Sequence, residues 1–151
     1  MSITIRPGNE NDYAAIHALI KEFAVFQKTP DKVTITIEQM IKEKDFFNCI
    51  VAEDSIGEIV GFASWFFAYY SWSGRAVYLD DLYVKASCRG QNTGTKLLES
   101  IIETARKMNC KKVRWQVSNW NKPAIAFYKK IGASIDDTEI NCDFNLVHIS
   151  G

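Results

Sequence analysis

A glycine-containing loop between a strand and a helix is the feature that most constrains the fold of this chain. The loop is Arg89-Gly90-Gln91-Asn92-Thr93-Gly94, and it follows a predicted strand over Arg75–Val84. Behind the loop, apolar residues recur at helical spacing from Leu97 to Met108, with charged residues between them. A further predicted strand, Lys111–Val117, completes a β-α-β unit, whose two strands should be parallel with a right-handed crossover. The chain is therefore expected to build a mixed sheet with helices against it.

Three segments before this unit have the composition and spacing of strands. Ser2–Arg6 alternates apolar and polar residues, and Phe46–Glu53 and Glu58–Tyr70 also have the pattern of strands, the latter rich in aromatic residues. Short turns join the last two of these segments to each other and to Arg75–Val84. An antiparallel meander is therefore expected from the three strands Phe46–Glu53, Glu58–Tyr70 and Arg75–Val84.

Four helices are predicted, and one of them is the helix behind the loop. The first begins at Asn9, where the apolar residues from Tyr13 to Phe23 recur at helical spacing. A short second helix follows Thr36, which begins a capping-box pattern. The last helix is capped by Asn121 and ended by Gly132.

The segment from Ser134 onward predicts one or two closing strands, because apolar residues alternate from Ile140 to Leu146. The predicted element order is then β-α-α-β-β-β-α-β-α-β-β. This order indicates an α/β (α+β) fold, with a mixed central sheet of about six to seven strands flanked by about four helices. The chain has 151 residues and no linker-like or repetitive segment, so a single domain over residues 1–151 is expected.

Charge and terminal patterns argue against several kinds of partner. Lys plus Arg equals Asp plus Glu, 18 each, so no nucleic-acid partner is expected. The N-terminus does not read as a signal peptide, and the longest apolar stretch, Phe62–Tyr70, is too short to cross a bilayer. We therefore expect no membrane partner, a cytoplasmic location and reduced cysteine thiols. His17 and His148 lack metal-ligand spacing, so no metal site is expected.

The loop before the long helix has the properties of an anion site. A helix N-terminus presents unpaired amides and the positive end of the helix dipole, and glycines let the backbone curl around an anion. Arg89 adds a donor for a phosphate, which suggests a diphosphate site. The alternative is an ordinary βα turn that happens to contain Gly90 and Gly94. The loop is neither a P-loop nor a Rossmann fingerprint, because the Gly-Lys-Ser/Thr ending and the third glycine are missing.

Three motifs occur in order along the chain. They are Leu79-Asp80-Asp81-Leu82-Tyr83-Val84, then Arg89-Gly90-x-x-x-Gly94, then Asn121-x-Pro123-x-x-x-Phe127-Tyr128-x-x-x-Gly132-Ala133. This series resembles the GNAT acetyltransferase superfamily, and within it most closely the diamine (spermidine/spermine) and thialysine N-acetyltransferases. The resemblance extends over roughly residues 3 to 147. It implies the GNAT fold, in which two splayed parallel strands form the cleft for acetyl-CoA.

The resemblance also implies a set of cofactor contacts. The backbone of Leu82, Tyr83 and Val84 would hydrogen-bond the pantetheine arm. The pyrophosphate would be held by the loop and the start of the helix, namely Arg89, Gly90, Gln91, Asn92, Thr93, Gly94 and Thr95. Asn121 would contact the pantetheine, and Tyr128 would lie near the thioester sulfur. The family usually has glycine where Asn92 stands, but asparagine tolerates a left-handed backbone better than other non-glycine residues.

Acetyl transfer to an amine needs a neutral nucleophile, whereas alkylammonium groups have a pKa of ~10. A carboxylate that removes the proton directly or through water is the usual solution. Asp80 is the candidate, since it precedes the pantetheine-binding segment and the resemblance puts a glutamate of close relatives at this position. Strict alternation would put Asp80 and Asp81 on opposite faces, so at most one would face the acceptor. The alternative is that both residues simply end a strand in solvent.

Tyr128 is the candidate that gives its proton to the departing CoA thiolate. Adjacent residues on a helix point about 100° apart, so Phe127 and Tyr128 cannot share one environment. The resemblance makes Tyr128 the cleft residue, and the alternative is an aromatic side chain packed on the sheet. The backbone amide near Leu82 would polarise the thioester carbonyl.

The acceptor pocket is expected to include Phe26, Gln27, Trp72 and Asp80, because aromatic faces and carboxylates attract alkylammonium groups. Further candidates are Trp65, Tyr69 and Tyr70. Core or dimer packing is the alternative for the aromatic side chains. In the diamine acetyltransferases the position matching Gln27 is acidic, which weakens the case for a polyamine substrate.

These residues predict an enzyme that needs no metal and transfers the acetyl group of acetyl-CoA to a primary amine in a ternary complex. The substrate would be a small diamine or polyamine, or a thialysine- or lysine-like amino acid. Two alternatives stay open: a CoA-binding or regulatory domain without catalysis, and a protein-lysine acetyltransferase. The retained Asp80 and Tyr128 favour the enzyme. The resemblance also implies a homodimer, for which the aromatic strand and the C-terminal strands offer interface material.

Overall fold

The computed structural model describes residues 2–147 of the chain. The chain divides into two compact units, unit 1 with residues 1–115 and unit 2 with residues 116–151. Unit 1 contains the sheet and three α-helices, and unit 2 contains one α-helix followed by an extended segment.

The sheet of unit 1 has five strands, which neighbour one another in chain order. They are β1 (Thr4–Pro7), β2 (Asn48–Glu53), β3 (Ile59–Tyr70), β4 (Gly74–Val84) and β5 (Val113–Arg114). The first four pair antiparallel, and the pairing of β2, β3 and β4 confirms the predicted meander. Strand β5 pairs parallel to β4, as predicted, but it is much shorter than the strand expected over residues 111–117.

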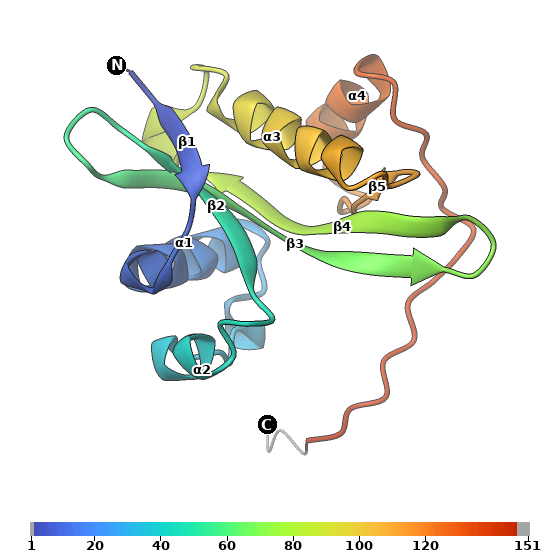
Figure 1. Cartoon of the computed structure of the whole chain (residues 1–151), viewed down its shortest axis with the longest axis horizontal. Coiled ribbons are helices and arrows are strands. Elements are labelled where there is room, and N and C mark those ends of the chain that lie inside the picture. Colours follow the sequence, from blue (N-terminus) through green and yellow to red (C-terminus); the bar gives the residue numbers. More distant parts are fainter. Residues whose placement is uncertain (1, 148–151) are drawn as a thin grey trace. The chain divides into compact units, whose positions relative to one another are not determined.

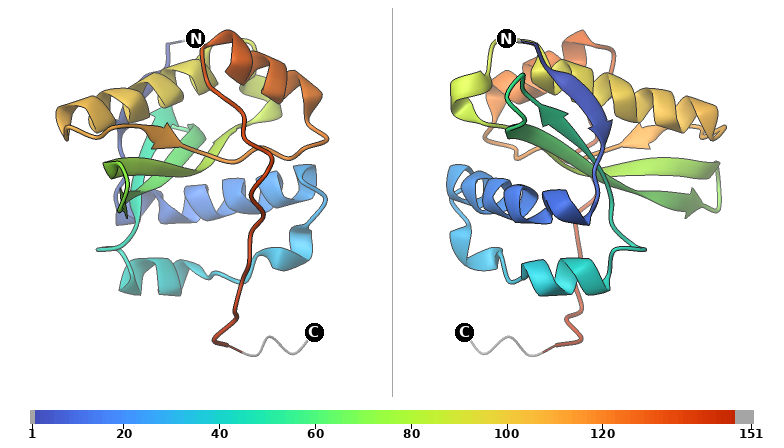
Figure 2. Two further views of the ribbon diagram at one scale, coloured as in Figure 1. Left: turned by 90° about the vertical axis from the view of Figure 1, so that its right-hand side faces the viewer. Right: turned by 60° about the vertical axis from the view of Figure 1, so that its left-hand side comes forward.

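Helices cover both faces of this sheet (Figure 1). Helix α3 (Thr93–Lys107) lies on one face, and α1 (Tyr13–Phe26) lies on the other with α2 (Ile37–Lys42) next to it. Views from two other sides show the same layers (Figure 2). Short 3-10 helices lie in the connections, namely η1 (Glu10–Asp12), η2 (Pro30–Lys32) and η3 (Ala86–Cys88).

Two groups of buried side chains fill the spaces on either side of the sheet. The α3-side core includes Val77, Leu79, Val84, Leu97 and Ile101. The α1-side core includes Ile16, Leu19, Val51, Phe62 and Tyr83. A β4 side chain that packs in the α3-side core therefore points to the α3 face of the sheet, and one that packs in the α1-side core points to the α1 face.

Unit 2 begins with a helix whose start was predicted from its capping residue. Helix α4 (Lys122–Lys130) follows Asn121, whose side-chain oxygen accepts a 3.4 Å hydrogen bond from the amide of Ala124. Pro123 lies in the first helical turn, where its missing N–H leaves no helical hydrogen bond unmade. The predicted cap is therefore confirmed.

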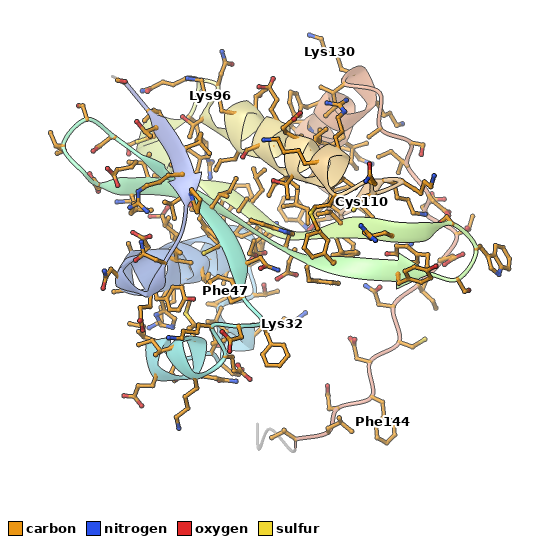
Figure 3. All side chains as sticks on the ribbon, in the orientation of Figure 1. Lys32, Phe47, Lys96, Cys110, Lys130 and Phe144 are labelled. Atoms are coloured by element: carbon orange, nitrogen blue, oxygen red, sulfur yellow. The ribbon has the colours of Figure 1, made fainter. Side chains whose placement is uncertain are left out.

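The closing strands predicted from Ser134 onward are not formed in the described part of unit 2, residues 116–147. Ile140, Phe144 and Leu146 are 86%, 90% and 91% exposed, and Figure 3 shows Phe144 on this extended segment. A strand is stable only where a neighbouring strand pairs with its backbone N–H and C=O groups, and residues 116–147 contain no strand that could do so. The described sheet therefore has five strands rather than six or seven.

Candidate active site

Strand β4 carries a β-bulge at its pair of carboxylates. Asp81 is paired with Ser64 of β3 and Leu79 with Trp65, so Asp80 is an extra residue in this register. An extra residue of this kind bends the strand and changes the direction of the side chains beside it. The bulge therefore lies at the residue predicted to take part in the chemistry.

The bulge puts both carboxylates on the same face of the sheet. Leu79 and Leu82 both contact the α3-side core, although they are three residues apart. Since neighbours in a strand point to opposite faces, Asp80 follows Leu79 onto the α1 side, and Asp81 precedes Leu82 on that same side. The expectation that alternation separates the two carboxylates is therefore wrong, because the extra residue interrupts the alternation.

Both carboxylates bind a proton more tightly than an isolated aspartate. Burial raises the pKa of Asp81 to about 6, and the negative charge of Asp80 adds to this effect. The Asp80 carboxylate reaches the surface, yet partial burial raises its pKa above the usual value as well. Asp81 is therefore a second candidate residue beside Asp80, and its position on the same face follows only from the register of β4 with β3.

Beyond the bulge, β4 has an unpaired edge on the side of β5. Strand β5 pairs with β4 only as far as Tyr78, so among the described residues no strand pairs with this edge from Leu79 to Val84. The free backbone groups of such an edge can bind an extended ligand. The side chain of Tyr83 belongs to the α1-side core instead, where it stacks on Phe23 at 5.0 Å and donates a 2.6 Å hydrogen bond to Glu22.

The loop after β4 has the backbone conformation that lets successive amides converge. Gly90 has a φ of 86° and Asn92 a φ of 61°, so Asn92 adopts the left-handed conformation expected of it. Asn92 is also the N-cap of α3, but its side chain makes no capping hydrogen bond. The amides of the first helical turn are therefore available to a ligand.

Thr93, the first residue of α3, adds a polar group at the same place. Its side chain is 2% exposed, and its Oγ1 has no hydrogen-bond partner among the described residues. An unpaired buried hydroxyl costs about 1–3 kcal/mol. This hydroxyl is covered by protein atoms, so a ligand would bind the uncapped backbone amides at the start of α3, and these amides fit a diphosphate group.

Arg89 ties the loop to the end of β4. Its Nε donates a 3.1 Å hydrogen bond to the carbonyl of Val84. Its guanidinium carbon lies 5.2 Å from the ring centre of Phe26 and 5.3 Å from that of Tyr83. The predicted phosphate donor therefore has a structural role as well, and Phe26 lies at the loop end of β4.

The structure does not gather the four predicted acceptor residues into one pocket. Phe26, the last residue of α1, lies beside Arg89, and Gln27 is the C-cap of α1. Trp72 is fully exposed in the turn between β3 and β4, which is the opposite end of β4. Asp80 lies between these two ends, at the bulge.

Unit 2 carries the remaining predicted residues. The rings of Phe127 and Tyr128 lie 5.8 Å apart and are tilted by 59°. Phe127 is 40% exposed and Tyr128 is half-buried, so their environments differ, as helix geometry requires. Burial raises the pKa of Tyr128, which keeps its phenol protonated at neutral pH. Asn121 uses its side-chain oxygen to cap α4.

Within residues 2–147, no group of three or more His, Cys, Asp and Glu side chains is placed to hold a metal ion. No helix in this part of the chain combines the length and apolar character needed to cross a membrane. The four cysteines are free thiols. His148, which entered the metal prediction with His17, lies outside the described residues.

Several known sequences similar to this chain are acetyltransferases. The sequence model of the Acetyltransferase (GNAT) family matches residues 13–133. A thialysine N-epsilon-acetyltransferase of Sus scrofa is 38% identical over 143 residues, which are 87% of this chain and 84% of that protein. A spermidine/spermine N(1)-acetyltransferase-like protein of Homo sapiens is 30% identical over 139 residues, which are 85% of this chain and 20% of that protein.

Solved structures share the fold at lower sequence identity. A transcriptional regulator from Bacillus halodurans C-125 superposes with a TM-score of 0.79 at 21% identity, covering 95% of this chain and 100% of that chain. An aminoglycoside acetyltransferase from an uncultured soil metagenomic sample gives a TM-score of 0.77 at 20% identity, covering 96% and 97%. These structures show that the mixed sheet with helices on both faces is a known arrangement.

Proposed function

The chain belongs to the acetyltransferase (GNAT) family, and we propose that it transfers the acetyl group of acetyl-CoA to the side-chain amine of a small, lysine-like amino acid such as thialysine. The observation that carries this proposal is the construction of β4, which has two carboxylates at its bulge and is followed directly by a loop that leaves the start of α3 without a side-chain cap. The names of the relatives support the substrate class, within the broader class of small primary amines.

The residues after the bulge fit the phosphate and pantetheine parts of acetyl-CoA. The open edge of β4 over Leu82–Val84 would hydrogen-bond the pantetheine. Arg89, Gly90 and the amides of residues 91–95 would hold the pyrophosphate. Bound acetyl-CoA supplies an acetyl thioester. The assignment of Asn121 to the pantetheine rests on the family resemblance alone.

Asp80 would take a proton from the substrate ammonium, directly or through a water molecule. Because alkylammonium groups have a pKa of ~10, the amine needs such a base before it can attack at neutral pH. Asp81 lies on the same face and keeps the local potential negative. This charge attracts the ammonium and raises the proton affinity of Asp80.

Tyr128 would donate its phenolic proton to the sulfur of the leaving thiolate. Its raised pKa supports this role, because a donor must hold its proton until the thiolate forms. The backbone amide near Leu82 would polarise the acetyl carbonyl oxygen. The role of Tyr128 is carried over from the family motif, which it matches at Phe127-Tyr128.

Gly94→Ala tests which side of the start of α3 faces the cofactor. A Cβ at this position would lie 3.7 Å from Leu82 Cδ2 and 3.9 Å from Val84 Cγ2, which are ordinary contact distances. Alanine is favoured over glycine in a helix by roughly 0.5–1 kcal/mol, so the variant is expected to unfold at an equal or higher temperature. Its affinity for CoA is expected to stay within about twofold of the wild type, because the methyl group would point toward Leu82 and Val84 of β4 and leave the amides of the loop uncovered.

Asn92→Gly is the matched control for this loop substitution. The φ of 61° at Asn92 suits glycine, so affinity for CoA is expected to be kept or slightly improved. Calorimetric titration with CoA and thermal unfolding measure the two properties for each variant. A marked loss of CoA affinity in Gly94→Ala would contradict the assignment of the loop amides to the pyrophosphate, and a marked loss in Asn92→Gly would mean that the ligand uses the asparagine side chain.

A panel of amines with acetyl-CoA tests the proposed reaction. Release of free thiol is measured with thialysine, lysine, short diamines and spermidine, each against a blank without amine. The highest kcat/KM is expected for thialysine. A preference for spermidine would contradict the amino-acid substrate, and no amine-dependent release from any of these compounds would contradict the enzymatic function.

We also propose that the chain is a single-domain, cytoplasmic homodimer. The resemblance to the diamine acetyltransferases supports a dimer, and so do the exposed apolar side chains of Ile140, Phe144 and Leu146. Light scattering at micromolar concentration is expected to give twice the chain mass of 17.2 kDa. A mass equal to one chain would count against the dimer.

A further inference from the structure

Two cations lie at the hairpin end of β4. The Nζ of Lys112 lies 4.7 Å and the guanidinium carbon of Arg114 lies 4.6 Å from the centre of the Tyr70 ring. None of the salt bridges formed among residues 2–147 includes either cation. An aromatic face attracts cations but does not neutralise them, so the pair can still bind an anion.

Both cations are on the same face of the sheet as the carboxylates at the bulge. Val113 lies between them in the sequence and contacts the α3-side core. Alternation therefore places Lys112 and Arg114 on the α1 side. Asp80 and Asp81 occupy this side as well, so the face carries two groups of opposite charge.

Tyr78 lies between these two groups. It is the register partner of Arg114 on β5, and it precedes Asp80 by two residues on the same face. Burial and the charges of Tyr70 and Asp80 raise the pKa of Tyr78, whereas Arg114 lowers it. The phenol of Tyr78 therefore interacts electrostatically with a carboxylate, Asp80, and with a cation, Arg114, on this face.

The spacing of the two groups matches a lysine-like molecule. Two residues along β4 span about 7 Å and neighbouring strands lie about 5 Å apart, so the backbones of Asp80 and Arg114 are separated by about 9 Å. An extended lysine-like side chain holds its amine and its α-carboxylate a comparable distance apart. When the amine lies at Asp80, the carboxylate is within reach of the guanidinium of Arg114.

We propose that Arg114, supported by Lys112, binds the α-carboxylate of the acceptor and thereby selects an amino acid over a diamine. This assignment rests on the proposed function, since it concerns the other end of the same acceptor. A guanidinium binds a carboxylate through two parallel hydrogen bonds. A diamine would bring a second ammonium group to the two cations, which repel it.

A hollow at the hairpin gives the carboxylate end room to bind. It has a volume of about 260 Å³ and is lined by Tyr70, Ser71, Trp72, Ser73, Lys112 and Arg114. The serine hydroxyls can donate hydrogen bonds to a carboxylate, and the exposed ring of Trp72 offers an aromatic face to the α-ammonium group. Trp72, predicted as a substrate residue, therefore belongs to the end of the acceptor site that is farther from the transferred group.

Arg114→Gln tests this assignment with two acceptors that differ only in the carboxylate. Thialysine is compared with its decarboxylated counterpart, bis(2-aminoethyl) sulfide. The KM for thialysine is expected to rise about ten- to a hundredfold with little change in kcat, while kcat/KM for the diamine stays the same or increases. Arg106→Gln removes the same charge from the exposed side of α3 and is expected to leave both acceptors unaffected.

Norleucine gives a second measurement, which needs no acetyl transfer. It keeps the α-carboxylate but lacks the side-chain amine, so it is expected to compete with thialysine for the wild type about tenfold better than for Arg114→Gln. Equal losses for thialysine and the diamine, or no change for thialysine, would overturn the carboxylate assignment and leave the acetyltransferase activity standing. A wild type that acetylates neither acceptor would overturn the proposed function as well.

Discussion

Asp80→Asn is expected to lower kcat/KM for thialysine by roughly 10²- to 10³-fold at neutral pH. The amide keeps the shape of the carboxylate but cannot take a proton from the substrate ammonium. Thiol release at saturating acetyl-CoA measures the loss. Because the Asp80 side chain is exposed, the unfolding temperature and the affinity for CoA are expected to stay close to those of the wild type. Asp45→Asn, at another exposed aspartate, is the control and is expected to keep full activity.

The pH profile tests the same carboxylate pair in an independent way. For the wild type, kcat/KM is expected to fall as the pH drops through about 6, because Asp81 then takes up a proton and no longer supplies the negative charge that attracts the substrate ammonium beside Asp80. Asp81→Asn removes a like charge beside Asp80, which lowers the pKa of the remaining carboxyl and moves this acid limb to lower pH. An acid limb that does not move, or an Asp80→Asn variant with more than about a third of wild-type activity, would contradict the assignment.

Tyr128→Phe is expected to lower kcat by roughly 10²-fold with little change in KM for either substrate. The substitution keeps the aromatic ring and removes only the hydroxyl that would protonate the leaving thiolate. The raised pKa of Tyr128 means that this proton is in place at neutral pH, so the loss should be visible across the neutral range. Thiol release and product formation, measured together, give the rate of transfer.

Tyr13→Phe is the matched control for this loss of a hydroxyl. Tyr13 belongs to the α1-side core and has no part in the proposed chemistry, so its variant is expected to keep the wild-type kcat. Thermal unfolding of both variants separates a catalytic effect from a loss of folded protein. Unchanged acetylation of every amine by Tyr128→Phe would remove the tyrosine from the mechanism.

Features that depend on neighbouring residues in the sequence could be predicted. The loop before α3 is one, because its glycine, its helix start and the left-handed conformation of Asn92 are all local properties. The capped start of α4 at Asn121 is another. The parallel pairing of β4 and β5 followed from the helix between them, since such a connection brings the chain back in the same direction.

Features that depend on the partner strand could not be predicted. The bulge at Asp80 exists only in the register between β4 and β3, and strict alternation therefore excluded Asp81. The alternating segment around Phe144 has the composition of a strand, but within the described part of unit 2 no strand pairs with it. Phe26 and Trp72 were grouped by chemistry alone, whereas the structure places them at opposite ends of β4.

Identification of the product tests the central claim most directly. Purified protein is incubated with acetyl-CoA and thialysine, and the amino acid is analysed by mass spectrometry with fragmentation to locate the acetyl group. A single acetyl group on the side-chain nitrogen, formed in equal amount to free CoA, is the predicted result. Binding of CoA without any acetylated amine, or release of thiol that does not depend on the amine, would contradict it.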